Sequence, residues 1–133
     1  MATDNKFNQF VKDLIDGVHD WDAHTFKVLL TNTAPVATNT KLADLSTVAV
    51  TNLDSVTLTV SSSGQTSGTY KLVLADKTMT ASGAVGPFQY VIIYNDTAAN
   101  DELICWYDYG SAVTLASGDT FKLDFGTELL SLA

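Results

Sequence analysis

The segment VHDWDAHT brings two histidines, His19 and His24, next to two aspartates, Asp20 and Asp22. Imidazole nitrogens and carboxylate oxygens can bind zinc or exchange protons with a substrate. A zinc site needs three or four ligands at fixed geometry, and no cysteine lies near this pair of histidines. The pattern is therefore a weak signal for a metal site or for acid–base catalysis, and ordinary loop histidines are the simpler expectation.

Oxygen-bearing side chains crowd the segment that starts with NDTAAND. They are Asn95, Asp96, Asn100, Asp101 and Glu102. Calcium prefers several hard oxygen ligands, but the order here does not follow the twelve-residue calcium loop with its central glycine. Because Asn and Asp are also common in turns, we expect a turn at this position and keep calcium binding as an alternative.

Aromatic residues are concentrated in the surrounding stretch, where they could stack on sugar rings. They are Tyr90, Tyr94, Trp106, Tyr107 and Tyr109. A sugar-binding platform needs exposed rings, whereas PFQYVIIYN and ELICWYDY carry apolar side chains on both faces of an extended chain. We interpret Phe88 to Tyr109 as a hairpin in the centre of a sheet, turned by NDTAAND and buried on at least one face. A glycan platform and a subunit contact remain the alternatives.

Signals for nucleophilic catalysis are absent from the sequence. There is no Gly-x-Ser-x-Gly elbow and no glycine-rich phosphate loop. Cys105 lies in the middle of an apolar run, where a thiol behaves as a small hydrophobic group. We therefore expect no enzymatic activity and no cofactor.

Composition and charge restrict the possible partners. The chain has 133 residues, enough for one domain over residues 1–133 with a single core. The chain has fifteen carboxylates, seven lysines and no arginine, which gives a net charge of −8. Scattered lysines in an acidic chain argue against nucleic acid, and no apolar run is long enough to cross a membrane. One cysteine and the lack of a signal-like N-terminus lead us to expect synthesis in a cytoplasm, without an internal disulfide.

The N-terminal segment has the period of a helix. Its apolar residues recur at spacings of three and four: Phe7, Phe10, Val11, Leu14 and Val18. We predict an amphipathic helix over about residues 5–16, capped by Asp4 and ended by Gly17. The face turned to solvent is predicted to carry Lys6, Gln9, Lys12, Asp13 and Asp16.

The rest of the chain, about residues 25–133, has the period of strands. Alternating segments are TFKVLLT, SVTLTVS, TYKLVLA and TFKLDF, with shorter ones at AVTL and ELLSL. Turn residues separate them in TNTAPVATNT, SSSGQTSG, ASGAVGP, NDTAAND, YGS and ASGD. The sequence thus predicts a mainly β domain, an antiparallel β-sandwich or jelly roll with one N-terminal helix.

Several long runs resemble a family of small structural proteins of tailed bacteriophages. The runs are KFNQFVKDLIDGVHDW, TFKVLLTNTAPVATNT, SSGQTSGTYKLVLAD and TASGAVGPFQYVIIYNDTAANDELICWYDYGSAVTLASGDTFKLDF. The most specific parts are TNTAP and the block from GPF to GDTF. Residues 44–54 are shorter and less glycine-rich than the family pattern, which leaves the strand that follows them open.

The resemblance implies a capsid decoration, or cement, protein. Such a protein binds the outside of an assembled phage head, stabilises the capsid lattice and has no active site. The implied partner is the major capsid protein, the implied state is a homo-oligomer (trimer or dimer), and the implied location is the capsid exterior of the virion, after synthesis in the host cytoplasm. The alternatives are a receptor- or glycan-binding module associated with the phage tail or fibre, and a cellular carbohydrate-binding module.

A decoration protein needs an adhesive segment, and the predicted helix is the first candidate. Its apolar residues Phe7, Phe10, Val11 and Leu14, with Pro35 in TNTAPVATNT, are the candidate oligomer or capsid contacts. We predict from this that Phe10→Asp weakens attachment and leaves the β core folded. The alternative is that the helix closes one end of its own domain.

Overall fold

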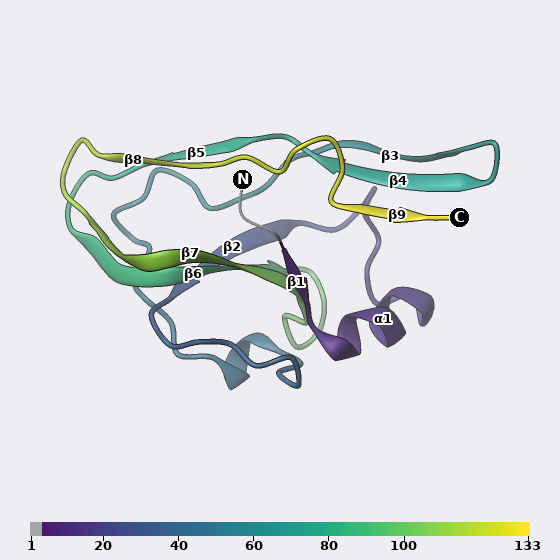
Figure 1. Cartoon of the computed structure of the whole chain (residues 1–133), viewed down its shortest axis with the longest axis horizontal. Coiled ribbons are helices and arrows are strands. Elements are labelled where there is room, and N and C mark those ends of the chain that lie inside the picture. The colour runs from purple at the N-terminus through teal and green to yellow at the C-terminus, as the bar shows by residue number, and fades with distance from the viewer. Residues whose placement is uncertain (1–3) are drawn as a thin grey trace.

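The described part of the chain, residues 4–133, forms one helix, one short 3-10 turn and a series of antiparallel strands in the computed structural model (Figure 1). The helix α1 spans Asn8–Ile15, and the 3-10 turn spans Leu42–Asp44. The strands are β1 (Asn5–Lys6), β2 (Phe26–Thr31), β3 (Val60–Thr66), β4 (Thr69–Leu74), β5 (Lys77–Thr80), β6 (Val85–Asn95), β7 (Leu103–Leu115), β8 (Thr120–Leu123) and β9 (Leu130–Leu132).

The strands form three separate antiparallel sheets. One has the order β1-β7-β6-β2, the second β3-β4-β9, and the third pairs β5 with β8. Figure 1 shows β2, β6 and β7 along one side of the molecule and the other two sheets along the opposite side. The predicted mainly β class with antiparallel sheets and one helix is confirmed. The three sheets do not close on one another, so the more specific prediction of a sandwich or jelly roll is not confirmed.

The two sides of the molecule share one core. Phe88 of β6 meets Phe121 of β8 edge-on, with ring centroids 5.2 Å apart. Tyr107 of β7 lies against Phe125, with centroids 6.1 Å apart. Buried side chains from both sides belong to one continuous cluster, and burial of this apolar surface is the main force that holds the sheets together.

The predicted central hairpin is confirmed. Strands β6 and β7 are the two inner strands of the four-stranded sheet, with Ile92 opposite Trp106, and the NDTAAND segment joins them. The predicted turn at YGS is wrong, because β7 runs through it to Leu115. Gly110 adopts a φ of +94° there, so the glycine absorbs an irregularity inside the strand where a turn was expected.

The predicted strand over residues 55–61 is largely wrong. This segment touches β2 through an isolated bridge between Lys27 and Thr57, and regular pairing begins only at Val60. β3 then continues through most of SSSGQTSG, which was predicted to be a turn. The actual turn is Ser67–Gly68, both with positive φ (51° and 84°). Two consecutive residues with positive φ form a tight turn whose twist suits a hairpin. The connection therefore needs only two residues, and β3 and β4 extend further into this segment than the sequence predicted.

The predicted helix starts too early and misplaces one side chain. Asn5 and Lys6 pair with Trp106 and Cys105 at the edge of the main sheet, so α1 begins at Asn8. Asp4 forms an ion pair with Lys6 and does not cap the helix; the N-cap residue is Phe7, without a side-chain cap. Gly17, at φ +81°, follows the end of the helix as predicted. Asp13 was expected in solvent but is only 7% exposed.

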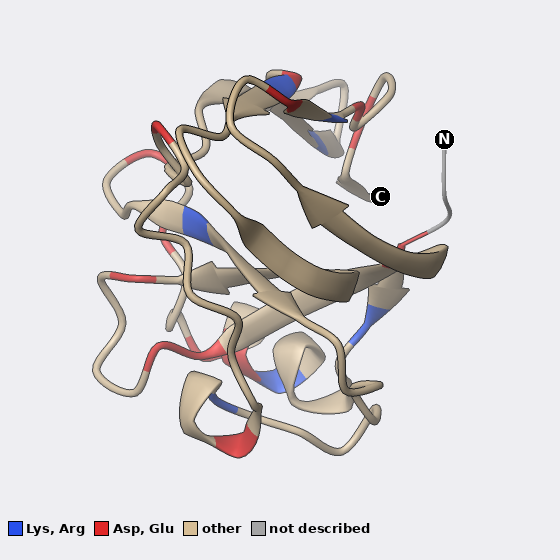
Figure 2. Ribbon diagram, turned by 90° about the vertical axis from the view of Figure 1, so that its left-hand side faces the viewer, with Lys and Arg blue, Asp and Glu red and all other residues tan. Residues whose placement is uncertain are grey.

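No helix within residues 4–133 has both the length and the apolar character needed to cross a bilayer. Acidic segments are spread over the face drawn in Figure 2, and the few lysines on it are separated from one another.

Candidate interaction surfaces

Three of the predicted contact residues are buried within the protein's own fold. Phe7 is fully buried, with its ring 4.6 Å from that of Trp106, and Phe10 is 2% exposed. Phe10 also packs near the rings of His19 and Trp21, at 5.5 Å and 6.4 Å. Pro35 is buried as well. The inner side of α1 therefore closes its own domain, which was the alternative prediction.

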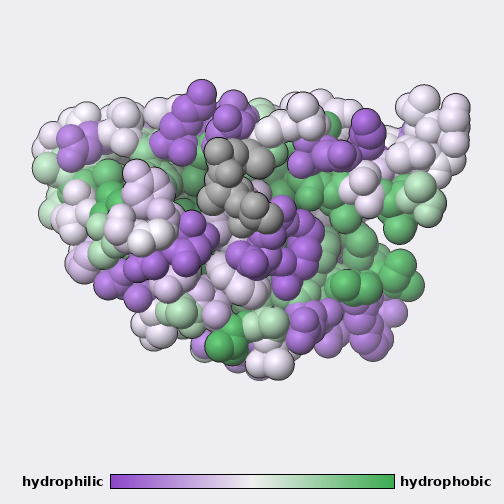
Figure 3. Space-filling view, viewed as in Figure 1, coloured by the Kyte–Doolittle hydropathy of each residue, from purple (hydrophilic) through white to green (hydrophobic). Residues whose placement is uncertain are grey.

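The outer side of α1 carries apolar side chains that are exposed to solvent. Val11 and Ile15 are 64% and 74% exposed, and Leu132 of β9 is 55% exposed. Figure 1 places α1 and β9 at the same end of the molecule, and Figure 3 shows hydrophobic side chains gathered there. We call Val11, Ile15 and Leu132, with the half-buried Leu14 and Leu130, the α1–β9 face. Large exposed apolar groups that gather in this way often mark a contact with another protein.

The strand β9 adds unpaired backbone to this face. It pairs with β4 on one side, from Leu72–Leu130 to Tyr70–Leu132, and no described strand pairs with its other edge. A free strand edge can accept a strand from another chain, because its N–H and C=O groups still need partners.

An aromatic groove opens between β7 and the segment around β8. It has a volume of about 460 Å³ and is lined by Val91, Tyr107, Tyr109, Phe121, Lys122, Leu123, Asp124 and Phe125. Of the five aromatic residues proposed for a glycan platform, only Tyr107 and Tyr109 line it. Tyr109 is 57% exposed, whereas Tyr107 is 8% exposed, and burial raises the pKa of the Tyr107 phenol above its ordinary value.

The histidines of VHDWDAHT are brought together by a residue that the sequence did not single out for this role. The side-chain nitrogen Nδ2 of Asn95 lies 3.0 Å from His19 Nδ1 and 2.9 Å from His24 Nδ1. Asn95 is fully buried at the end of β6, 76 residues after His19. Its position at a strand end followed by a turn was the only available signal, and that signal suggested a turn residue.

Metal ligands do not converge at either of the two segments considered as alternative metal sites. Between Asp4 and Ala133, no group of three or more His, Cys, Asp or Glu side chains is arranged to hold a metal ion. In the loop considered for calcium, Asp96 forms an ion pair with Lys27 at 3.0 Å, and Glu102 accepts a hydrogen bond from the backbone of Asn100. These contacts give two of the loop oxygens partners from the protein itself.

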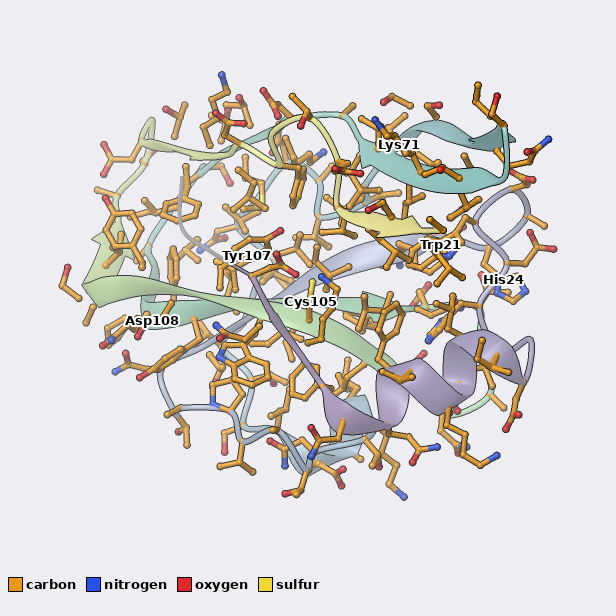
Figure 4. All side chains as sticks on the ribbon, turned by 45° about the vertical axis from the view of Figure 1, so that its right-hand side comes forward. Trp21, His24, Lys71, Cys105, Tyr107 and Asp108 are labelled. Atoms are coloured by element: carbon orange, nitrogen blue, oxygen red, sulfur yellow. The ribbon has the colours of Figure 1, made fainter. Side chains whose placement is uncertain are left out.

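Cys105 lies along β7 with Tyr107, as Figure 4 shows, and its side chain is fully buried. Burial raises the pKa of the thiol to about 12. Because the thiolate is the reactive form, this cysteine behaves as part of the core.

Comparisons with known proteins give no match: no protein-family model, no curated protein and no solved structure corresponds to the chain. The resemblance to phage structural proteins therefore stays a prediction from the sequence blocks quoted above.

Proposed function

We propose that the chain is a non-enzymatic structural protein of a tailed-phage virion that binds the outside of the head and stabilises the capsid lattice. Its partner is the major capsid protein, its location is the capsid exterior, and it acts as a homo-oligomer, a trimer or a dimer. We also propose that its two facing layers belong to the sandwich class. The resemblance of TNTAP and the GPF-to-GDTF block suggests this role, and the exposed α1–β9 face is the structural observation that supports it best.

The α1–β9 face suits repeated weak attachment. Three large apolar side chains, exposed on α1 and β9 at the same end of the molecule, lose contact with water when a partner covers them. Each fully buried side chain of this kind stabilises a contact by roughly 1.5–3 kcal/mol. That is modest for one site. On a lattice, an oligomer attaches through several such sites at once, and the effective concentration of the second site multiplies the affinity.

Binding to purified heads tests the proposal directly. The protein is added to empty expanded heads of the phage that encodes it, and bound copies are counted by gel densitometry and electron microscopy. Saturation near the copy number of the major head protein is expected. A few copies at the tail tip would contradict the head assignment.

Matched variants test the face itself. Ile15→Asp should lower head binding or oligomer formation at least tenfold, because a carboxylate at the centre of an apolar contact would be desolvated. Thr78→Asp is the control, since Thr78 is exposed on β5, which lies away from α1 and β9 (Figure 1). Equal binding by both variants would remove the α1–β9 face from the proposal.

The aromatic groove favours a second candidate function, a glycan-binding module of the tail or fibre. Tyr109 exposes an aromatic ring beside Phe121, with centroids 5.4 Å apart, and Lys122 and Asp124 supply polar groups that could bond to sugar hydroxyls. Chemical-shift changes at the groove with simple hexoses, lost in Tyr109→Ala, would support this candidate. No change at saturating sugar would remove it.

A further inference from the structure

Asn95 is a buried amide with hydrogen-bond contacts at both its oxygen and its nitrogen. Its oxygen Oδ1 accepts from the backbone N–H groups of Thr97 (3.0 Å) and Ala98 (3.1 Å). Its nitrogen Nδ2 faces His19 Nδ1 and His24 Nδ1, at 3.0 Å and 2.9 Å, and lies 3.5 Å from the backbone oxygen of Val18. An amide has two N–H donors and one oxygen with two lone pairs, so the two short contacts to the histidines use both donors and the Val18 oxygen is a more distant acceptor.

The backbone contacts determine the protonation of both rings. Because Oδ1 must face the two N–H donors, the NH₂ group must face the histidines, and it can only donate to them. Each Nδ1 is therefore unprotonated, and each neutral ring carries its proton on Nε2. The backbone N–H of Asp20 also approaches His24 Nδ1, at 3.3 Å, which agrees with an acceptor at that atom.

Acceptors for a charged His19 already lie nearby. Asp13 Oδ2 on α1, Glu102 Oε2 before β7 and His19 Nε2 are buried atoms without a hydrogen-bond partner among the described residues. The charges of Asp13 and Glu102 are close enough to favour the protonated ring, while His24 and burial oppose it. Three aromatic rings also lie close to His19: Phe10, Trp21 and Phe26.

We propose that Asn95, His19 and His24 form an acid-sensitive latch that holds α1 and the loop after it to the end of β6. A proton on Nδ1 of either histidine would face the NH₂ group of Asn95 and break that hydrogen bond. A protonated His19 then turns toward Asp13 and Glu102, and the buried N–H group of Asn95 keeps only the backbone oxygen of Val18, 3.5 Å away, as an acceptor. A buried donor with so poor a hydrogen bond is costly, so the open arrangement gains population. The latch is independent of the proposed role in the virion.

The direction of the pH effect follows from burial. Desolvation lowers the pKa of His19 below its ordinary 6.5, so in the range just below 6.5 an opened or unfolded chain binds a proton that the closed chain does not. Closure is therefore fully favoured above about pH 6.5. It weakens as the pH falls from there and stops changing below the lowered pKa.

The first experiment is a long-range ¹H–¹⁵N NMR spectrum of the wild-type protein at pH 7.5. Both histidines should show an unprotonated Nδ1 and a protonated Nε2. The opposite tautomer on either ring would overturn the proposal without any variant being needed.

The second experiment follows hydrogen exchange of α1 amides from pH 7.5 to 5, corrected for the intrinsic rate. Protection of α1 should fall at least tenfold more than protection of β6. The double variant His19→Asn/His24→Asn offers an uncharged oxygen in place of each Nδ1, so its α1 protection should be nearly independent of pH. The same acid loss in that variant would show that other groups are responsible.

Discussion

Trp21 and Phe26 stack with ring centroids 4.3 Å apart and planes inclined by 22°. This pair joins the loop after α1 to the start of β2, and Figure 4 shows Trp21 and His24 in that loop. Trp21 is 7% exposed, and its Nε1 is buried without a hydrogen-bond partner among residues 4–133. The ring thus contributes packing at the cost of an unsatisfied donor.

Replacing Trp21 should separate these two contributions. Trp21→Ala is expected to lower the free energy of unfolding by about 3–5 kcal/mol through the cavity it leaves. Trp21→Phe keeps an aromatic ring and removes the orphan N–H, so we expect a loss of less than half as much. Urea denaturation measures both. Equal losses of unfolding free energy in the two variants would contradict this account, because they would mean that the indole N–H group is hydrogen-bonded.

The prediction for Phe10→Asp changes with the structure. Phe10 is 2% exposed, so a carboxylate there should unfold the domain or reduce its stability by at least about 3 kcal/mol, where the sequence had suggested a specific loss of attachment. Val11→Asp, one residue later and 64% exposed, should alter the thermal midpoint by little. A cooperative native-like transition in Phe10→Asp would restore the original expectation.

Gly86 should not tolerate a side chain. Its φ is +117°, and an added Cβ would lie 2.5 Å from the backbone oxygen of Val113 on the neighbouring strand. Gly86→Ala should therefore cost at least about 2 kcal/mol, because the strain adds to the clash. Gly64→Ala in β3 is the matched control, since a Cβ there meets nothing within 4 Å. Similar midpoints for the two variants would contradict this account of β6.

Cys105 should resist thiol reagents until the protein unfolds. With a pKa of about 12 and no exposed surface, almost no accessible thiolate exists at pH 8. Ellman's reagent should label one thiol immediately in denaturant and many times more slowly in buffer. Rapid labelling of the native protein would show that the β1–β7 edge opens frequently.

Calcium should leave the thermal midpoint unchanged. Asp96 already pairs with Lys27, one Glu102 oxygen accepts from a backbone N–H group, and Asn95 is buried, so these side chains do not converge on one point. Because any ligand of the native state raises the midpoint, a rise in millimolar calcium that EDTA reverses would contradict the present description of this loop.

The elements that follow from the local alternation of apolar and polar residues were predicted correctly. The β6–β7 hairpin followed from continuous apolar runs on both sides of one turn, and β2 from the alternation of Phe26, Val28 and Leu30. The start of α1 was missed because Asn5 and Lys6 gain sheet hydrogen bonds from Trp106 and Cys105, far along the chain. Helical period alone could not reveal that competition.

The candidate sites were predictable only in part. The aromatic concentration indicated Tyr107 and Tyr109, but Phe121 and Phe125 complete the groove from another strand region. The histidine pair was noticed and given no partner, since Asn95 approaches it through tertiary packing. The apolar period of α1 marked both of its sides and did not tell Phe10, which is buried, from Val11, which is exposed.

The pairing of β9 with β4 has a consequence for synthesis. β4 ends at Leu74, and β9 begins only at Leu130, after every other described strand has left the ribosome. The β3–β4 hairpin can form early, but one edge of β4 stays open until β9 has been synthesised. An open edge can pair with another nascent chain, so the order of synthesis creates a period of vulnerability that ends when β9 arrives.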